Sequence, residues 1–148
     1  MQQQRVRDWM SRDVHVVRPD TSAFEAYDSM RRHNIRRLPV VDLDGRLLGI
    51  VTRSDIEQAM PQSRGEEDRR HGLFELAGTV VSDLMTQNPL TVTPESSIRN
   101  AAATIMRAKV SGLPVVANDR LVGIITESDI FRLVVSTWPD DDDEATEA

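Results

Sequence analysis

Threonine and aspartate stand three residues apart in two octapeptides that share most of their letters. The first, GIVTRSDI, contains Thr52 and Asp55, and the second, GIITESDI, contains Thr126 and Asp129. A hydroxyl and a carboxylate at the start of a helix can accept hydrogen bonds from two neighbouring hydroxyl groups, such as those of a ribose. The same spacing also fits a capping box, which only stabilises a helix start. The tetrapeptide alone leaves both interpretations open.

The two octapeptides are the ends of a repeat that covers most of the chain. They recur at an offset of 74, and the motifs upstream of them recur at an offset of 75. The upstream pairs are Asp8-Trp9-Met10 with Asp83-Leu84-Met85, Pro19 with Pro94, and LPVV at 38–41 with LPVV at 113–116. A half of roughly 50 residues buries little apolar surface by itself. We therefore expect the halves to pack on each other, with the functional cleft between them.

Each copy predicts the element order β-α-β-β-α, which is an α/β (α+β) fold. Short strands are expected at 14–17 and 90–93, each ended by a proline. Helices should follow the caps Ser22 and Ser97, with a capping box between Ser22 and Glu25. The predicted core faces of these helices are Ala23, Ala26, Tyr27 and Met30 in the first copy, and Ile98, Ala101, Ala102, Ile105 and Met106 in the second.

A β-hairpin and a last helix complete each copy. The apolar runs at 38–41 and 47–51 flank Asp44-Gly45, and those at 113–116 and 121–125 flank Asn118-Asp119, which are both turn signals. The last helices are expected from Ser54 to about residue 60 and from Ser128 to about residue 135. The octapeptides therefore lie where a strand passes into a helix.

Composition excludes several classes of protein. The chain has 148 residues and no cysteine, and its three histidines have no metal-ligand spacing, so we expect no disulfide and no metal site. No apolar run is long enough to span a membrane and the start lacks a signal peptide, which predicts a soluble cytoplasmic protein. No catalytic constellation is visible, which predicts that the chain is not an enzyme.

The net charge of −6 comes from the end of the chain. Six of the 24 acidic residues lie in the last ten positions. The rest of the chain has no excess of basic charge, which argues against general nucleic-acid binding. The basic residues gather instead in the first copy, at Arg31, Arg32, Arg36, Arg37 and Arg53. This cluster is either a local anion site or a solvated helix end.

The VxDxM lead-ins, the LPVV runs and the GIxTxSDI ends resemble the tandem CBS domain family, also called the Bateman module. The resemblance spans about residues 6–136, and the motifs occur in the same order twice. It implies two domains packed sheet to sheet with pseudo-two-fold symmetry, and modules that often form homodimers. The predicted division is CBS domain 1 at 1–60, a linker at 61–79, CBS domain 2 at 80–138 and a disordered acidic tail at 139–148. The linker is expected to be mobile at first and to become a short helical stretch before the second domain.

The resemblance also implies a function. It predicts a regulatory sensor that binds AMP, ADP, ATP or S-adenosylmethionine in the cleft, has no covalent cofactor and acts on an unknown protein target. Thr52 with Asp55, and Thr126 with Asp129, match the ribose positions of the family. The other positions matched to the nucleotide are Val16, Val17, Arg37, Pro39 and Arg53 in the first copy, and Val92, Thr93 and Pro114 in the second.

The two predicted sites differ where a phosphate would bind. The first offers Arg37 and Arg53, whereas the second has Gly112 and Glu127 at the matching positions. A carboxylate beside a phosphate weakens binding by like-charge repulsion. We therefore favour the first site for charged nucleotides and allow the second to be empty. The alternative function is a structural or dimerisation module that binds no ligand.

Overall fold

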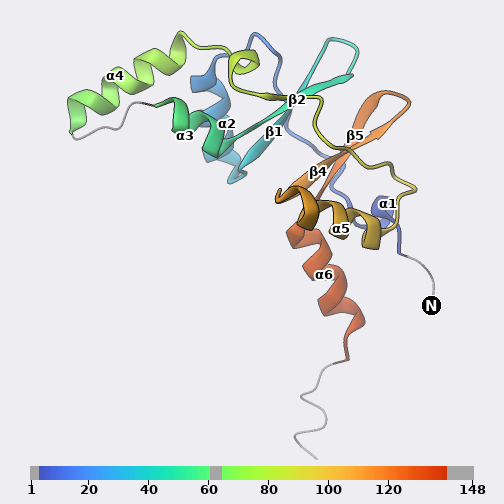
Figure 1. The fold of residues 1–148 in the computed structure, drawn as a ribbon. Coiled ribbons are helices and arrows are strands. Elements are labelled where there is room, and N and C mark those ends of the chain that lie inside the picture. The colour runs from blue at the N-terminus through green and yellow to red at the C-terminus, as the bar shows by residue number, and fades with distance from the viewer. Residues whose placement is uncertain (1–3, 61–64, 140–148) are drawn as a thin grey trace, which may run out of the picture.

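The structure, a computed structural model, describes residues 4–60 and 65–139. The two copies lie side by side, each with a β-hairpin and helices beside it (Figure 1). The first copy contains α1 (Val6–Trp9), α2 (Ala23–His33), β1 (Arg37–Val41), β2 (Leu47–Thr52) and α3 (Arg53–Ala59), and α4 (Glu66–Ala77) follows it. The second copy contains the 3₁₀ helix η1 (Val81–Asp83), β3 (Thr86–Gln87), α5 (Ile98–Ala108), β4 (Gly112–Ala117), β5 (Arg120–Thr126) and α6 (Glu127–Thr137).

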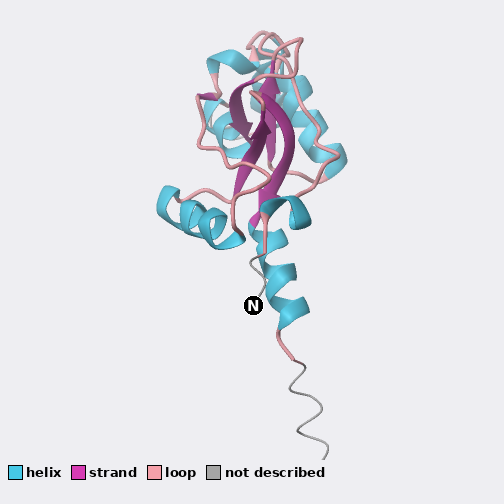
Figure 2. Ribbon diagram, turned by 90° about the vertical axis from the view of Figure 1, so that its right-hand side faces the viewer, coloured by secondary structure: helices cyan, strands magenta, loops and turns pink. Residues whose placement is uncertain are grey.

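Both predicted hairpins form, and they lie at the centre of the molecule with helices on their flanks (Figure 2). In the first turn Gly45 has a φ of +82°, and in the second Asn118 and Asp119 have φ values of 52° and 64°. These are the residue types that adopt left-handed backbone at the least cost, which explains why the hairpins turn there. The hairpins also meet at their tips, where Leu121 N donates to Gly45 O over 3.0 Å.

The helices α2 and α5 begin at the predicted serine caps. Ser22 Oγ accepts from Glu25 N, and Ser97 Oγ accepts from Asn100 N, each over 3.0 Å. The predicted core residues are buried or packed against the core, except that Ala102 is only partly buried and that the prediction for Met106 is wrong, because Met106 is 79% exposed. Thr104 is buried instead. Its hydroxyl donates to Asn100 O over 2.8 Å, so its burial leaves no unsatisfied polar group in the core.

The two predicted first strands are reduced to single parallel bridges. Val17 pairs with Val40 and Val92 pairs with Val115. The next residue in each segment turns its backbone N–H away from the sheet, because Arg18 N donates to Thr21 Oγ1 and Thr93 N donates to Ser96 Oγ. A proline then follows in each copy, so the ladder stops after one residue.

The lead-in of each copy, which is residues 6–10 in the first and 81–85 in the second, packs into the other copy's half of the fold. Val6 of α1 is fully buried in the core of the second copy, and Val81 of η1 is fully buried in the core of the first. The strand β3 pairs with β2 of the first copy, and Ser11 forms a bridge with Ile124 of β5. This exchange interlocks two halves that would each bury too little surface alone.

The helix α4 starts earlier than the predicted helical stretch, within the charged part of the segment. It begins at Glu66 and ends at Ala77, and its Leu76 is buried in the core of the first copy. The predicted acidic tail beyond Pro139 lies outside the described residues. In the described part of the chain, no helix combines the length and the apolar character that crossing a membrane requires.

Candidate functional site

A cavity of about 1100 Å³ opens between the two copies. From the first copy it is lined by the end of β2 and the start of α3, which carry Thr52 and Asp55. From the second copy it is lined by Thr86, by residues 88–90, by the end of α5 and by the start of β4. Its apolar lining includes Ile50, Leu90, Ile105, Leu113 and Pro114. The cavity therefore combines an aliphatic wall from one copy with a polar helix start from the other.

Thr52 and Asp55 form a complete capping box at the start of α3. Thr52 N donates to Asp55 Oδ2 over 2.8 Å, and Asp55 N donates to Thr52 Oγ1 over 3.1 Å. Asp55 remains partly exposed and lines the cavity. Within residues 4–60 and 65–139, its second carboxylate oxygen has no hydrogen-bond partner. The motif thus caps a helix and still presents an acceptor to the cleft.

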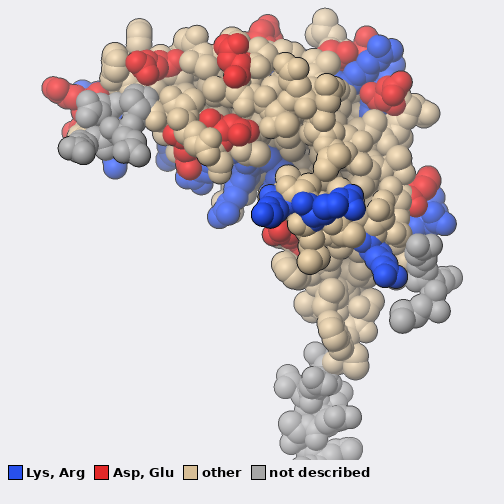
Figure 3. Space-filling model, viewed as in Figure 1, with Lys and Arg blue, Asp and Glu red and all other residues tan. Residues whose placement is uncertain are grey.

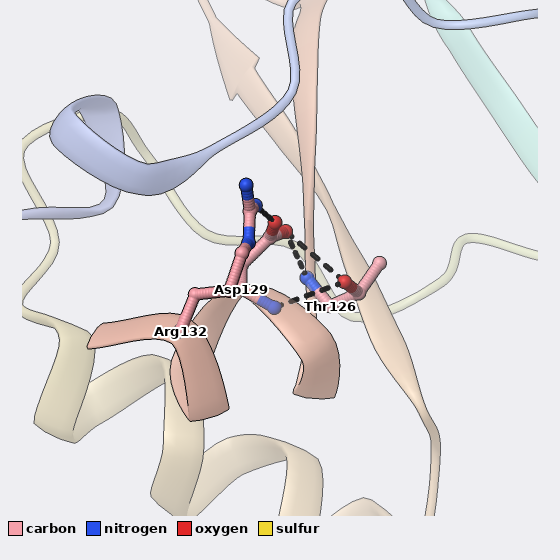
Figure 4. Close-up of polar contacts among 3 residues, drawn as sticks. All are labelled: Thr126, Asp129 and Arg132. Atoms are coloured by element: carbon pink, nitrogen blue, oxygen red, sulfur yellow. Dashed lines mark hydrogen bonds and ion pairs between the residues drawn. The ribbon is translucent and has the colours of Figure 1, made fainter. Parts of the chain in front are cut away.

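Thr126 and Asp129 form the same box at the start of α6, but the carboxylate is enclosed. Asp129 is 3% exposed, and its Oδ2 accepts from Thr126 N over 2.8 Å and from Thr126 Oγ1 over 3.1 Å. Its Oδ1 accepts from the guanidinium of Arg132, one helical turn further on (Figure 4). Both oxygens of the second carboxylate therefore already have partners.

Basic side chains gather where the two copies meet (Figure 3). Those that line the cavity are Arg36, Arg37, Arg53 and Lys109. Arg37 reaches across the cleft and donates to Ser111 Oγ. Burial lowers the pKa of Arg37, and the nearby carboxylate of Glu127 acts in the opposite direction. The cavity lining therefore carries four basic side chains against three carboxylates, which are Asp55 and Glu57 from the first copy and Glu127 from the second.

Arg53 is held against its own helix. Its Nε donates to Glu57 Oε1 over 2.8 Å, and its guanidinium lies 5.8 Å from the centre of the Tyr27 ring. The hydrogen bond to Glu57 raises the pKa of Arg53. Two N–H groups at the start of α3 are also occupied, because Arg53 N donates to Arg36 O over 2.8 Å and Asp55 N donates to Thr52 Oγ1. An anion in the cavity would therefore depend on side chains such as Arg36, Arg37 and Lys109 more than on the helix start.

The structure brings five of the predicted site residues to this cavity. They are Arg37, Thr52, Arg53, Asp55 and Pro114. Val16 and Val17 line a separate depression of about 380 Å³ beside α2, while Pro39 and Val92 are buried. Thr93 holds the turn before α5 through Ser96. The nucleotide-binding roles of all these residues stay predictions.

Sequence reasoning missed Lys109 and the segment at 86–90 as parts of the cavity. Lys109 ends α5 with a left-handed φ of 56°, as Asn34 ends α2 with a φ of 52°. The repeat offset relates these two residues, and both precede the start of the β-hairpin. That correspondence is the signal which could have placed the only lysine of the chain at the cleft.

Comparison with known proteins gives a consistent result. The family model described as CBS domain matches residues 6–62 and 81–136. A CBS domain-containing protein of Dictyostelium discoideum is 36% identical over 131 residues, which cover 88% of this chain and 90% of that protein. Other curated relatives are longer. For example, the match to inosine-5′-monophosphate dehydrogenase of Korarchaeum cryptofilum is 36% identical and covers 86% of this chain but 24% of the enzyme.

Solved structures of similar chains include two with adenosine compounds. CBSX2, a CBS-pair protein of Arabidopsis thaliana, was solved in complex with AMP; it is 30% identical with a TM-score of 0.78, covering 92% of this chain and 99% of that one. The CBS domain pair of protein MJ0100 was solved with 5′-methylthioadenosine and S-adenosyl-L-methionine. It is 30% identical with a TM-score of 0.77, and the match covers 93% of this chain and 100% of that one.

Proposed function

The chain belongs to the CBS domain family, as a tandem pair, and we propose that it binds an adenosine-containing ligand in the cavity between its two copies. Ligand binding would then regulate a protein partner. The observation that carries this proposal is Asp55, a partly exposed carboxylate at the wall of a large cavity, one oxygen of which has no partner among the residues that the structure describes. The solved relatives that hold AMP or S-adenosyl-L-methionine support the same class of ligand.

The lining of the cavity suits the three parts of a nucleotide. The second carboxylate oxygen of Asp55 can accept from a ribose hydroxyl, as acidic residues do in dinucleotide sites. The aliphatic side chains of Leu90 and Ile105 offer an apolar surface for a base. Arg36, Arg37 and Lys109 can meet phosphate oxygens with charge-assisted hydrogen bonds. The volume of about 1100 Å³ is ample for a nucleotide.

The competing function is a structural module that binds no ligand. It is favoured by one observation, since both capping boxes are complete without any ligand. The motif would then need no further explanation. A regulatory output, a homodimer and a protein target also stay predictions.

A thermal-shift experiment distinguishes the two functions. The purified chain is heated with AMP, ADP, ATP, NAD or S-adenosylmethionine, and the same is done with the variants Asp55→Ala and Asp129→Ala. A ligand at about 100 times its dissociation constant adds about 2.7 kcal/mol to the free energy of unfolding. We expect a rise in Tm that Asp55→Ala abolishes.

Asp129→Ala is the matched control, because it removes the equivalent capping box. Loss of a cap lowers the free energy of unfolding of each variant by about 1 kcal/mol, so both variants start from a lower Tm without ligand. Only Asp55→Ala should also remove the response to ligand. If none of the five ligands shifts the Tm of the unmodified chain, the two motifs serve only as helix caps and the structural function is preferred.

A further inference from the structure

The same four-residue motif has two different environments in the two copies. Asp55 is partly exposed, lines the cavity and keeps one oxygen without a partner among the described residues. Asp129 is 3% exposed and both of its oxygens accept hydrogen bonds from its own copy. Thr, Ser and Asp are the same in both copies, while the second position of the motif is Arg53 in one and Glu127 in the other.

A residue beyond the motif contacts the enclosed carboxylate. Arg132 lies three residues after Asp129 on α6, and its guanidinium donates to Asp129 Oδ1 (Figure 4). The repeat offset of 74 places Gln58 at the matching position of the first copy. Glutamine is neutral and cannot form the same ion pair. Arginine at one position and glutamine at the other therefore separate a closed carboxylate from an open one.

The opposite wall of the second site also differs from that of the first. Leu90 and Ala108 line the open cavity, and the offset of 75 relates them to His15 and His33. The two imidazole rings lie with their centres 3.7 Å apart and an angle of 32° between their planes. His33 is fixed further, because its Nδ1 is 2.9 Å from Ser29 O. By the repeat, two rings in contact therefore correspond to the leucine and the small alanine that line the first site.

We infer that Arg132, together with the His15–His33 pair, closes the second site, so that each chain binds a single adenosine ligand, at Asp55. This inference rests on the proposed function. A ribose hydroxyl at Asp129 would have to displace a guanidinium from a buried carboxylate, and so exchange a charge-assisted hydrogen bond for one from a neutral donor. At Asp55 the ligand meets no such competitor among the described residues. Arg132 and Gln58 therefore determine which copy binds the ligand.

The first experiment is isothermal titration of the chain with AMP. We expect one AMP per chain, lost in Asp55→Asn and retained in Asp129→Asn. Asparagine keeps the shape of the side chain and one acceptor oxygen, which limits the damage to the fold. Two AMP molecules per chain, or a single site that Asp129→Asn removes, would overturn the inference.

The second experiment exchanges the determinants between the copies. Gln58→Arg should weaken AMP binding by about tenfold or more, because the new guanidinium competes for Asp55. The variant that combines Arg132→Gln, His15→Leu and His33→Ala reproduces the first site in the second copy, and it should bind a second AMP. Arg120→Gln, which removes a charge from the tip of the second hairpin, should change neither value. A folded triple variant that still binds one AMP would show that these side chains do not close the site.

A ligand-free measurement separates this inference from the proposed function. In a double-mutant cycle, the Tm changes of Asp129→Asn and Arg132→Gln should be strongly non-additive, because the two side chains form one contact. The matched cycle of Asp55→Asn and Gln58→Ala should be additive. If AMP does not bind at all, the proposed ligand fails, while the cycle still decides whether Arg132 occupies Asp129. Additivity at Asp129 and Arg132 would overturn the inference whether or not AMP binds.

Discussion

Arg37 of the first copy donates a hydrogen bond across the cleft to Ser111 Oγ of the second. The position that matches Arg37 in the repeat is Gly112, and a Cβ there would lie 3.3 Å from Arg37 Nη1. The guanidinium thus fits beside a residue that has no side chain. This pairing of a large residue with glycine breaks the symmetry of the two copies at the centre of the cleft, and places a positive charge at the edge of the cavity.

Replacing Arg37 should weaken the binding of charged nucleotides. In Arg37→Ala the cavity loses one guanidinium and keeps the carboxylate of Glu127, so the remaining charge repels phosphate more strongly. We expect about a tenfold loss of AMP affinity, and a larger loss for ATP, measured by isothermal titration. Ser111→Ala is the control, since it removes the acceptor and leaves the charge. Equal binding of ATP by Arg37→Ala and the unmodified chain would exclude Arg37 from phosphate binding.

Gly49 is the close-contact position on β2 where the lead-in of the second copy crosses. A Cβ at Gly49 would lie 2.6 Å from Met85 Sδ and 2.7 Å from the backbone oxygen of Thr86. Since β3 is paired with β2 at this point, the backbone cannot move away freely. We expect Gly49→Ala to lower the free energy of unfolding by about 1 to 3 kcal/mol, measured by urea denaturation.

Gly65→Ala is the matched control for that substitution, because a Cβ at Gly65 meets no atom of the described residues within 4 Å. It should leave the stability almost unchanged. Gly123→Ala should resemble Gly49→Ala, since a Cβ there would lie 2.8 Å from Ser11 O in the other lead-in. A Gly49→Ala variant as stable as Gly65→Ala would contradict the exchange of lead-ins between the copies.

Local patterns predicted the elements of the fold, and long-range choices were harder to predict. The caps at Ser22 and Ser97 and the turns at Gly45 and Asn118 depend on a few neighbouring residues, and the structure confirms them. The exchange of lead-ins could not be predicted, because a short apolar segment such as Val6–Met10 fits either of two similar cores. Sequence patterns do not distinguish equivalent partners.

The candidate site shows the same division. The placement of Thr52 and Asp55 at a cavity follows from the strand-to-helix junction that the motif predicts. The enclosure of Asp129 depends on the direction of the Arg132 side chain, which the sequence leaves free. Ion pairs at this spacing are common on exposed helices and contribute little there. The buried carboxylate gives this pair its importance, and burial was known only from the structure.

Asp42 should make the first hairpin sensitive to acid. Its Oδ1 accepts from Arg46 N and from Asp44 N, each over 2.9 Å, and the bond from Arg46 N is the main reason that its pKa is lowered. A carboxyl with a lowered pKa in the folded chain stabilises the fold above its usual pKa of 3.8, and this effect is lost as the pH falls through the folded-state value.

The Tm difference between the unmodified chain and Asp42→Ala should therefore be largest near neutral pH and vanish in strong acid. Thermal unfolding at a series of pH values measures it. Asp44→Ala is the control, because it removes the same charge from the same turn while the backbone donor to Asp42 remains. A Tm difference that does not change between neutral and strongly acidic pH would contradict the role of the Asp42 carboxylate.

The outer face of α6 should form the interface of the predicted homodimer. Phe131 and Val135, one turn apart, are 65% and 77% exposed, and Trp138 follows at 68%. Large apolar side chains on one face of a helix mark an association surface more often than a solvated one. Burying each contributes about 1.5 to 3 kcal/mol, so the double variant Phe131→Ser, Val135→Ser should weaken the dimer by about 100-fold or more. Sedimentation equilibrium measures the dissociation constant.

Leu43→Ser provides the control for this interface, since Leu43 is 90% exposed at the first hairpin turn, away from α6. The same loss of apolar surface at that turn should leave the dimer intact, because the expected contact depends on a continuous helix face. An unmodified chain that sediments as a monomer would reject the homodimer itself. A dimer that survives in the double variant would move the interface to another surface, such as the exposed Met106 on α5.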